Sequence, residues 1–227
     1  MGGVISIRNR WLDHEGYEFL NDFAYGSFST IRESFSILSK TGNLDLAGAF
    51  FTLHSDGHRD GADGNQIVAY TAMRYGINSN WSIGIRNKIL HIVGSDPGTV
   101  THPYSEHWFD VWRDSSSINF VWNKKPFQLS IIPYSNIGIH ELYDGYYSID
   151  YVEGISSELE WKINKMFKLL LGLNSQIVFG RVENRIDLEK YDVNSLIDFA
   201  FYNQLIIQPI PTLFITLGTR ELYSLTY

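Results

Sequence analysis

Charged side chains recur at every second position in several stretches of this sequence. One residue separates Arg86 from Lys88, and one residue separates Glu158 from Glu160. Because successive side chains of a β-strand face opposite sides, such charges gather on one face of a sheet, where they can attract and orient polar solutes. The residues that this pattern assigns to one charged face are Arg8, Arg10, Arg32, Arg74, Arg86, Lys88, Glu158, Glu160, Lys162, Lys168, Asp198 and Arg220.

This charged set divides along the chain. Its early members are all basic, whereas its later members mix acidic side chains with Lys162, Lys168 and Arg220. If the opposite faces of the strands meet lipid, the charges line an interior in which a basic wall opposes an acidic one. Such walls could steer charged or polar solutes through a narrow pore. Alternatively the charges pair and fill the interior, because an unpaired buried charge is costly.

Two further groups contain the residue types of a hydrolase. His54, Ser55 and Asp56 lie together, and the segment HPYSEH occupies residues 102–107. These offer a nucleophile, a base and an orienting carboxylate. Neighbouring His54 and Ser55 point to opposite faces if their strand continues. A lipid hydrolase therefore stays an alternative function, and no catalytic residue is assigned.

The loop SDGHRDGADGN, residues 55–65, contains candidate ligands for a metal ion. Its oxygen-bearing side chains are Asp56, Asp60, Asp63 and Asn65. Calcium prefers such ligands, but their spacing departs from the EF-hand loop, so we interpret the segment as a solvated acidic loop. In residues 102–107, Pro103 disfavours the helix on which the known zinc motifs depend. We assign no metal and expect no cofactor.

The element that must position these charges is clearest in residues 156–180, which predict a β-hairpin. Its first arm directs Glu158, Glu160 and Lys162 to one side and Leu159, Trp161 and Ile163 to the other. After a tight connection at residues 164–166, the second arm places six apolar side chains on one face. These are Phe167, Leu169, Leu171, Leu173, Ile177 and Phe179. Such arms need an apolar medium against one face, which a membrane or a protein core can supply.

The same alternation predicts about eleven strands in all, separated by tight and mostly long connections in turn. We expect tight turns at residues 40–43, 76–80, 123–126, 164–166 and 208–211. Longer connections are expected at residues 12–29, 55–65, 94–116 and 181–194, and the first strand is expected at residues 4–11. We expect a β-bulge at Pro133, because proline cannot donate to a ladder.

Composition bounds the class of protein. The 227 residues carry a net charge of −7, which opposes general nucleic-acid binding, and we expect one domain, residues 1–227. Aromatic residues make up 15% and charged residues 19%, which favours a membrane-exposed wall over a typical soluble domain. The absence of cysteine excludes disulfide scaffolds. No apolar run has the length of a transmembrane helix, and no signal peptide opens the sequence, so we expect an exported form whose leader has been removed.

Alternating tight and long connections place all tight turns on one rim, which predicts an all-β fold: an up-and-down antiparallel transmembrane β-barrel of about 10–12 strands. With Tyr223, Leu225 and Tyr227 in step at its end, the chain resembles bacterial outer-membrane β-barrel proteins as a class. The resemblance implies a bacterial outer-membrane location, a lipid bilayer around the barrel, and a passive porin-like pore or channel for small polar or charged solutes. The remaining alternative is a soluble barrel or sandwich, acting as a binding module, whose apolar faces turn inward.

Overall fold

A single antiparallel sheet of 12 strands forms the whole computed structural model, which describes residues 10–191 and 195–226. The predicted all-β, up-and-down fold is confirmed. The strands are β1 (Gly16–Tyr25), β2 (Ile31–Thr41), β3 (Leu44–Ser55), β4 (Gly64–Gly76), β5 (Trp81–Ser95), β6 (Trp108–Lys124), β7 (Phe127–Leu142), β8 (Tyr146–Lys162), β9 (Phe167–Asn184), β10 (Glu189–Tyr191), β11 (Leu196–Ile210) and β12 (Leu213–Thr226). In the described part of the chain, no helix is long and apolar enough to cross a membrane.

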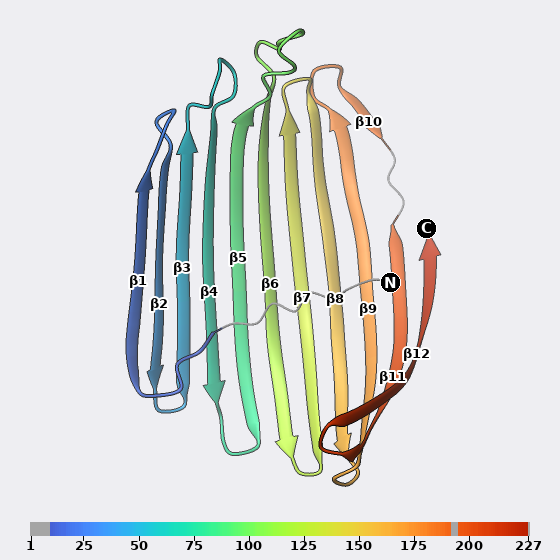
Figure 1. Ribbon diagram of the computed structural model, residues 1–227. Coiled ribbons are helices and arrows are strands. Elements are labelled where there is room, and N and C mark those ends of the chain that lie inside the picture. The colour runs from blue at the N-terminus through green and yellow to red at the C-terminus, as the bar shows by residue number, and fades with distance from the viewer. Residues whose placement is uncertain (1–9, 192–194, 227) are drawn as a thin grey trace.

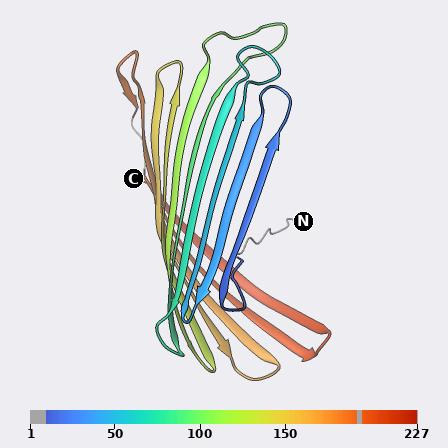
Figure 2. The ribbon, with the colours of Figure 1, turned by 90° about the vertical axis from the view of Figure 1, so that its left-hand side faces the viewer.

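Each long strand pairs with the next one along the chain, so the sheet follows the order of the sequence (Figure 1). The short strand β10 pairs only with β9, and β9 continues the sheet through β11. Seen from the side, the sheet curves into a trough (Figure 2). Its edge strands, β1 and β12, make no contact with each other among the described residues. The curvature is that of a barrel wall, and the sheet is open.

The connections differ between the two rims. At the lower rim in Figure 1 they are short and span residues 42–43, 77–80, 125–126, 163–166 and 211–212. At the upper rim they include residues 56–63 and 96–107. The five tight turns predicted from the sequence therefore all lie on one rim, while the opposite rim holds both long connections and short ones, at residues 26–30, 143–145 and 185–188.

Three of the predicted connections contain strand residues and are shorter than expected. Residues 12–29 contain β1, residues 94–116 include the start of β6 at Trp108, and residues 181–194 include the end of β9 at Asn184 and strand β10. The upper ends of β6 and β9 carry polar side chains on both faces, which weakens the alternation that marks a strand. Of the strand predicted at residues 4–11, residues 4–9 lie outside the described residues, and Arg10 and Trp11 are not in a strand.

The predicted bulge at Pro133 is wrong. Pro133 stands opposite Ile155 in an unshifted β7–β8 register. Pairing between β6 and β7 lapses for two residues there and resumes in the same register. The missing N–H therefore leaves a gap in the ladder and needs no extra residue. A register shift occurs instead between Ile207 and Ile210, beside Pro209.

A protein core is nearly absent from this sheet. The only buried apolar residues in the described part of the chain are Leu12, Ala72 and Ala200. A soluble chain of this length would bury a large apolar interior. The expectation for a soluble barrel, with apolar faces turned inward against one another, is therefore not met within the described residues.

Candidate solute-facing surface

The strand register decides which side chains share a face, because directly opposed residues point to the same side. Asp45 opposes Arg74, Lys162 opposes Lys168, and Asp198 opposes Gln176. Followed across the sheet, the register places on one face every member of the predicted charged set that lies in a described strand. These members are Arg32, Arg74, Arg86, Lys88, Glu158, Glu160, Lys162, Lys168, Asp198 and Arg220.

This charged face is the concave one. Residues 10–15, the described residues before β1, lie over it at the lower end of the sheet (Figure 2). The guanidinium carbon of Arg74 is 5.1 Å from the centre of the Trp11 ring, and the Lys40 ammonium donates to the Leu12 carbonyl at 3.5 Å. Arg10, in the same segment, pairs with Glu18 at 2.6 Å. Arg8 lies outside the described residues. Trp11 and Leu12 therefore contact the lower part of the concave face, near the ends of β2 and β4.

Acidic partners neutralise most of the early basic wall. Arg74 pairs with Asp45 at 2.7 Å, and only 9% of the Asp45 side chain is exposed. Arg32 pairs with Asp22 at 2.6 Å. The sequence interpretation missed both carboxylates as partners, because it did not include Asp45 in the charged set and placed Asp22 in a connection. The polar–apolar alternation of the residues around each carboxylate was the signal that could have placed it on the charged face.

The later wall is held by contacts between adjacent strands. Glu160 accepts ion pairs from Lys162 at 3.2 Å and from Lys168 at 3.3 Å. The Tyr202 hydroxyl donates to Glu158 at 3.0 Å. Asp198 accepts hydrogen bonds from the Gln176 amide at 2.9 Å and the Ser224 hydroxyl at 2.6 Å. The acidic groups are thus satisfied within their own wall.

A third charged group, which the sequence interpretation missed, lies between these walls. Arg113 of β6 donates to Asp150 of β8 at 3.1 and 3.2 Å, across the intervening strand β7. It also donates to Asn136 at 2.7 Å, and the His140 ring lies 3.2 Å from it. The polar–apolar alternation is weak around Arg113. Its segment was therefore predicted as a connection, and Arg113 was not assigned to a face.

Three cations of the predicted set have no ion pair or hydrogen bond among the described residues: Arg86, Lys88 and Arg220. Arg86 and Lys88 are neighbours on one face of β5. Arg86 borders a hollow of about 250 Å³ on the concave face, together with Trp11 and Asn119. Two of the three cations without a partner are therefore neighbours on β5.

The convex face carries two rows of aromatic side chains. Near the short turns, Trp81 stands opposite Trp122, with ring centres 6.3 Å apart. Trp122 is ten residues from Trp112 on β6, and Trp161 is ten residues from Tyr151 on β8. Ten residues of a strand span about 34 Å, or about 25 Å along the axis of a barrel whose strands tilt by about 40°. That height equals the apolar band, with an aromatic girdle at each interface, of outer-membrane barrels.

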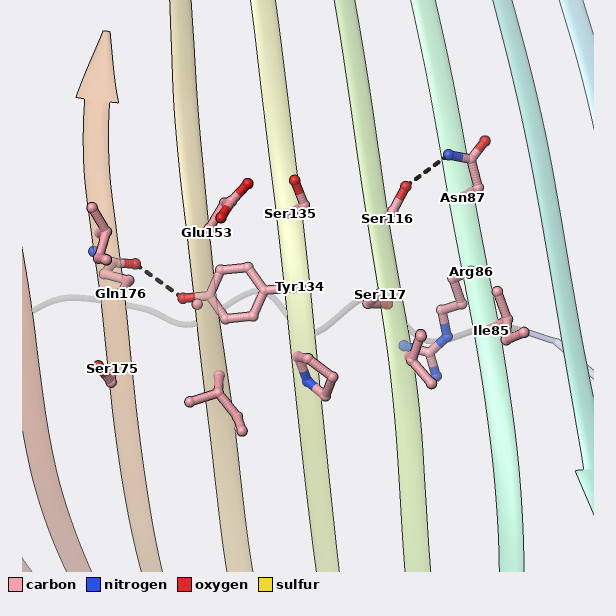
Figure 3. A pocket seen from close by; sticks show the side chains of 15 residues that line it. Ile85, Arg86, Asn87, Ser116, Ser117, Tyr134, Ser135, Glu153, Ser175 and Gln176 are labelled. Carbon is pink, nitrogen blue, oxygen red and sulfur yellow. Dashed lines mark hydrogen bonds between the residues drawn. The ribbon is translucent and has the colours of Figure 1, made fainter.

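Polar side chains interrupt the convex face between the two rows. A hollow of about 700 Å³ there is bordered by Ser116, Ser135, Ser175 and Glu153 (Figure 3). The Asn87 amide donates to Ser116 at 2.9 Å and to Asp114 at 2.7 Å. No hydrogen bond or ion pair to Glu153 is present among the described residues. The apolar band of the convex face is therefore incomplete at β6 to β9.

The residues considered for a hydrolase are not assembled into one. His54 lies 3.2 Å from Asp56, whereas the Ser55 hydroxyl bonds Thr30 at 2.9 Å. His54 and Ser55 belong to opposite faces of β3, and they share no hydrogen bond. In residues 102–107, the His107 ring stacks on Tyr143 with ring centres 3.7 Å apart. Within the described ranges, no three histidine or carboxylate side chains are grouped to hold a metal ion.

The fold and its two unlike faces define the class: a wall of an outer-membrane type of β-barrel. Comparisons of the sequence with protein-family models and with curated proteins gave no match. Solved structures of outer-membrane transporters and receptors share the fold. They include the copper transporter OprC, with a TM-score of 0.77 at 11% identity over 96% of this chain and 38% of that one.

Two other structures show the same likeness. The ferripyoverdine receptor of the outer membrane of Pseudomonas aeruginosa gives a TM-score of 0.76 at 9% identity, covering 97% of this chain and 38% of that one. The FrpB iron transporter from Neisseria meningitidis gives 0.73 at 9% identity, covering 95% and 43%. The chain thus spans about two fifths of the length of these structures. The shared fold supports the predicted outer-membrane location.

Proposed function

We propose that this chain forms part of the wall of a transport barrel in a bacterial outer membrane. Its convex face meets the lipid bilayer, and its concave face lines a passive path for small polar or charged solutes. The observation that carries this proposal is the separation of the faces. Charged side chains gather on the concave face, while aromatic rows about 25 Å apart border an apolar band on the convex face.

The lack of a protein core supports lipid as the medium of the convex face. Leu173 is 49% exposed, Phe179 42% and Trp161 39%, although all three lie within long paired strands. Contiguous apolar surface of this extent is unfavourable in water. A bilayer removes it from water without requiring a second layer of protein.

The charge of the concave face supports a preference among solutes. The described strands place more basic than acidic side chains on this face. Arg86 and Lys88 have no counter-ion among the described residues, and two lysines share the carboxylate of Glu160. Selectivity in pores depends on the lining charges and the diameter. We therefore expect anionic or neutral polar solutes to pass more readily than cations. The similar structures are named a copper transporter, an iron transporter and a ferripyoverdine receptor, which supports transport but leaves the cargo of this chain to experiment.

The test is conductance of the protein extracted from outer membranes as it is assembled there. In a salt gradient across a planar bilayer, we expect a reversal potential that shows a preference for anions. The double variant Arg86→Ala with Lys88→Ala should lose that preference, whereas Lys125→Ala, in a short turn, should keep it. An absence of conductance, or a reversal potential that the double variant leaves unchanged, would contradict the solute path and favour a filled interior.

A further inference from the structure

The two edges of the sheet are built for pairing. β1 is 10 residues long and β12 is 14, and neither contains the lysine or proline with which soluble proteins protect an edge. Every described residue of β12 is exposed. In a bilayer there is no water to satisfy the free N–H and C=O groups of an edge, so an open sheet cannot span it. Under the proposed function, other strands must cover both edges.

The direction of the edge strands limits which strands can do so. Along the sheet path, ten antiparallel pairings separate β1 from β12, so the two strands run in the same direction. Figure 1 shows both arrows pointing to the upper rim. A direct β1–β12 contact would therefore be parallel, whereas bacterial barrels are antiparallel throughout and have an even number of strands. The described sheet cannot close on itself in that way.

A second copy of the chain meets the same obstacle. If both copies are inserted with their short turns on the same side, β12 of one copy meets β1 of the other, and both seams are parallel. Turning one copy over would make the seams antiparallel. It would also place the long connections of that copy on the side that carries short turns in outer-membrane barrels.

We infer that the barrel is completed by a separate sheet with an odd number of antiparallel strands. Its first and last strands run opposite to β12 and β1, and it has an apolar convex face and a polar concave face. This inference rests on the proposed function. It agrees with the comparisons, because the structures with this curvature are more than twice as long as the segment that this chain matches.

The test fuses a second copy of some of the chain's own strands to the C-terminus of the full chain. Residues 26–210, appended to the C-terminus, add nine strands of the sheet path and begin and end with strands that run downward in Figure 1. Residues 26–184 add eight and serve as the matched control. We expect only the nine-strand extension to give a species that resists unfolding in SDS until it is heated. Equal behaviour of the two extensions, or heat-modifiable migration of the unextended chain expressed alone, would overturn the inference.

Cross-linking tests the excluded closures directly, because the chain contains no cysteine. The pair Asn21→Cys with Thr219→Cys joins the two edges, and we expect neither a bond within the chain nor a disulfide-linked dimer. The control pair Asn203→Cys with Thr219→Cys joins adjacent strands whose side chains are hydrogen-bonded at 2.7 Å, and it should cross-link fully. An edge-to-edge bond would refute the inference and leave the membrane location intact. Recovery of the chain outside the outer membrane would instead refute the proposed function.

Discussion

The concave and convex faces of this sheet are made by the same strands but solve different problems. On the concave face, charges such as Arg74 and Asp45 find partners on the next strand, and Arg113 reaches across β7 to Asp150. On the convex face, aromatic rings pair along two rows, as with Tyr151 and Phe179 at 4.6 Å. The difference shows that each face is matched to its own medium. A protein core is not what holds the strands together.

The contrast has an energetic side. Ion pairs in contact with water contribute little to stability, so the concave network mainly keeps its charges satisfied. Apolar side chains on the convex face contribute by leaving water, at about 25 cal/mol per Å². If this account is right, adding or removing a charge must change stability very differently on the two faces.

The largest effect is expected from a charge placed on the convex face. Leu171→Arg, between the two aromatic rows of the convex face, should destabilise the protein folded in lipid by about 2–4 kcal/mol. Gln204→Arg, on the concave face of neighbouring β11, is the matched control and should cost much less. Urea titration of the barrel as it is assembled in outer membranes, extracted and reconstituted in lipid vesicles, measures both. Equal losses would contradict the assignment of the faces.

A smaller effect is expected from breaking a concave ion pair. Arg74→Ala leaves the Asp45 carboxylate, 9% exposed, without its partner and should cost about 1–3 kcal/mol. Adding Asp45→Asn to that variant removes the orphaned charge and should restore part of the loss. The same urea titration checks this, and a double variant no more stable than Arg74→Ala would refute the pairing as the cause.

The smallest effect is a gain. Glu153 is an acidic side chain on the convex face, within the band between the aromatic rows. Glu153→Leu should raise stability in lipid by about 1 kcal/mol, because a carboxylate facing lipid is unfavourable. Glu158→Leu, on the concave face, loses the hydrogen bond from Tyr202 and should bring no gain. A loss of stability in Glu153→Leu would show that this part of the convex face is covered by something other than lipid.

How far the sequence predicted this arrangement varied along the strands. Where one face of a strand is apolar and the other is polar, the alternation in the sequence is strong. The predicted hairpin of residues 156–180 is accordingly confirmed as part of β8 and β9. Toward the upper rim both faces are polar, and the beginning of β6 and the end of β9 were read as loops. Side-chain partners were harder to predict. The Arg113–Asp150 contact spans three strands, and it depends on a register that one strand alone does not reveal.

The most direct test of the two faces uses tryptophan fluorescence in vesicles made with brominated lipids, which quench only rings in contact with acyl chains. Two variants each keep one of the six tryptophans and replace the other five by phenylalanine. Trp161 of the convex face should be strongly quenched, whereas Trp11, which lies over the concave face, should not be. Quenching of Trp11 as strong as that of Trp161, or no quenching of Trp161, would contradict the account.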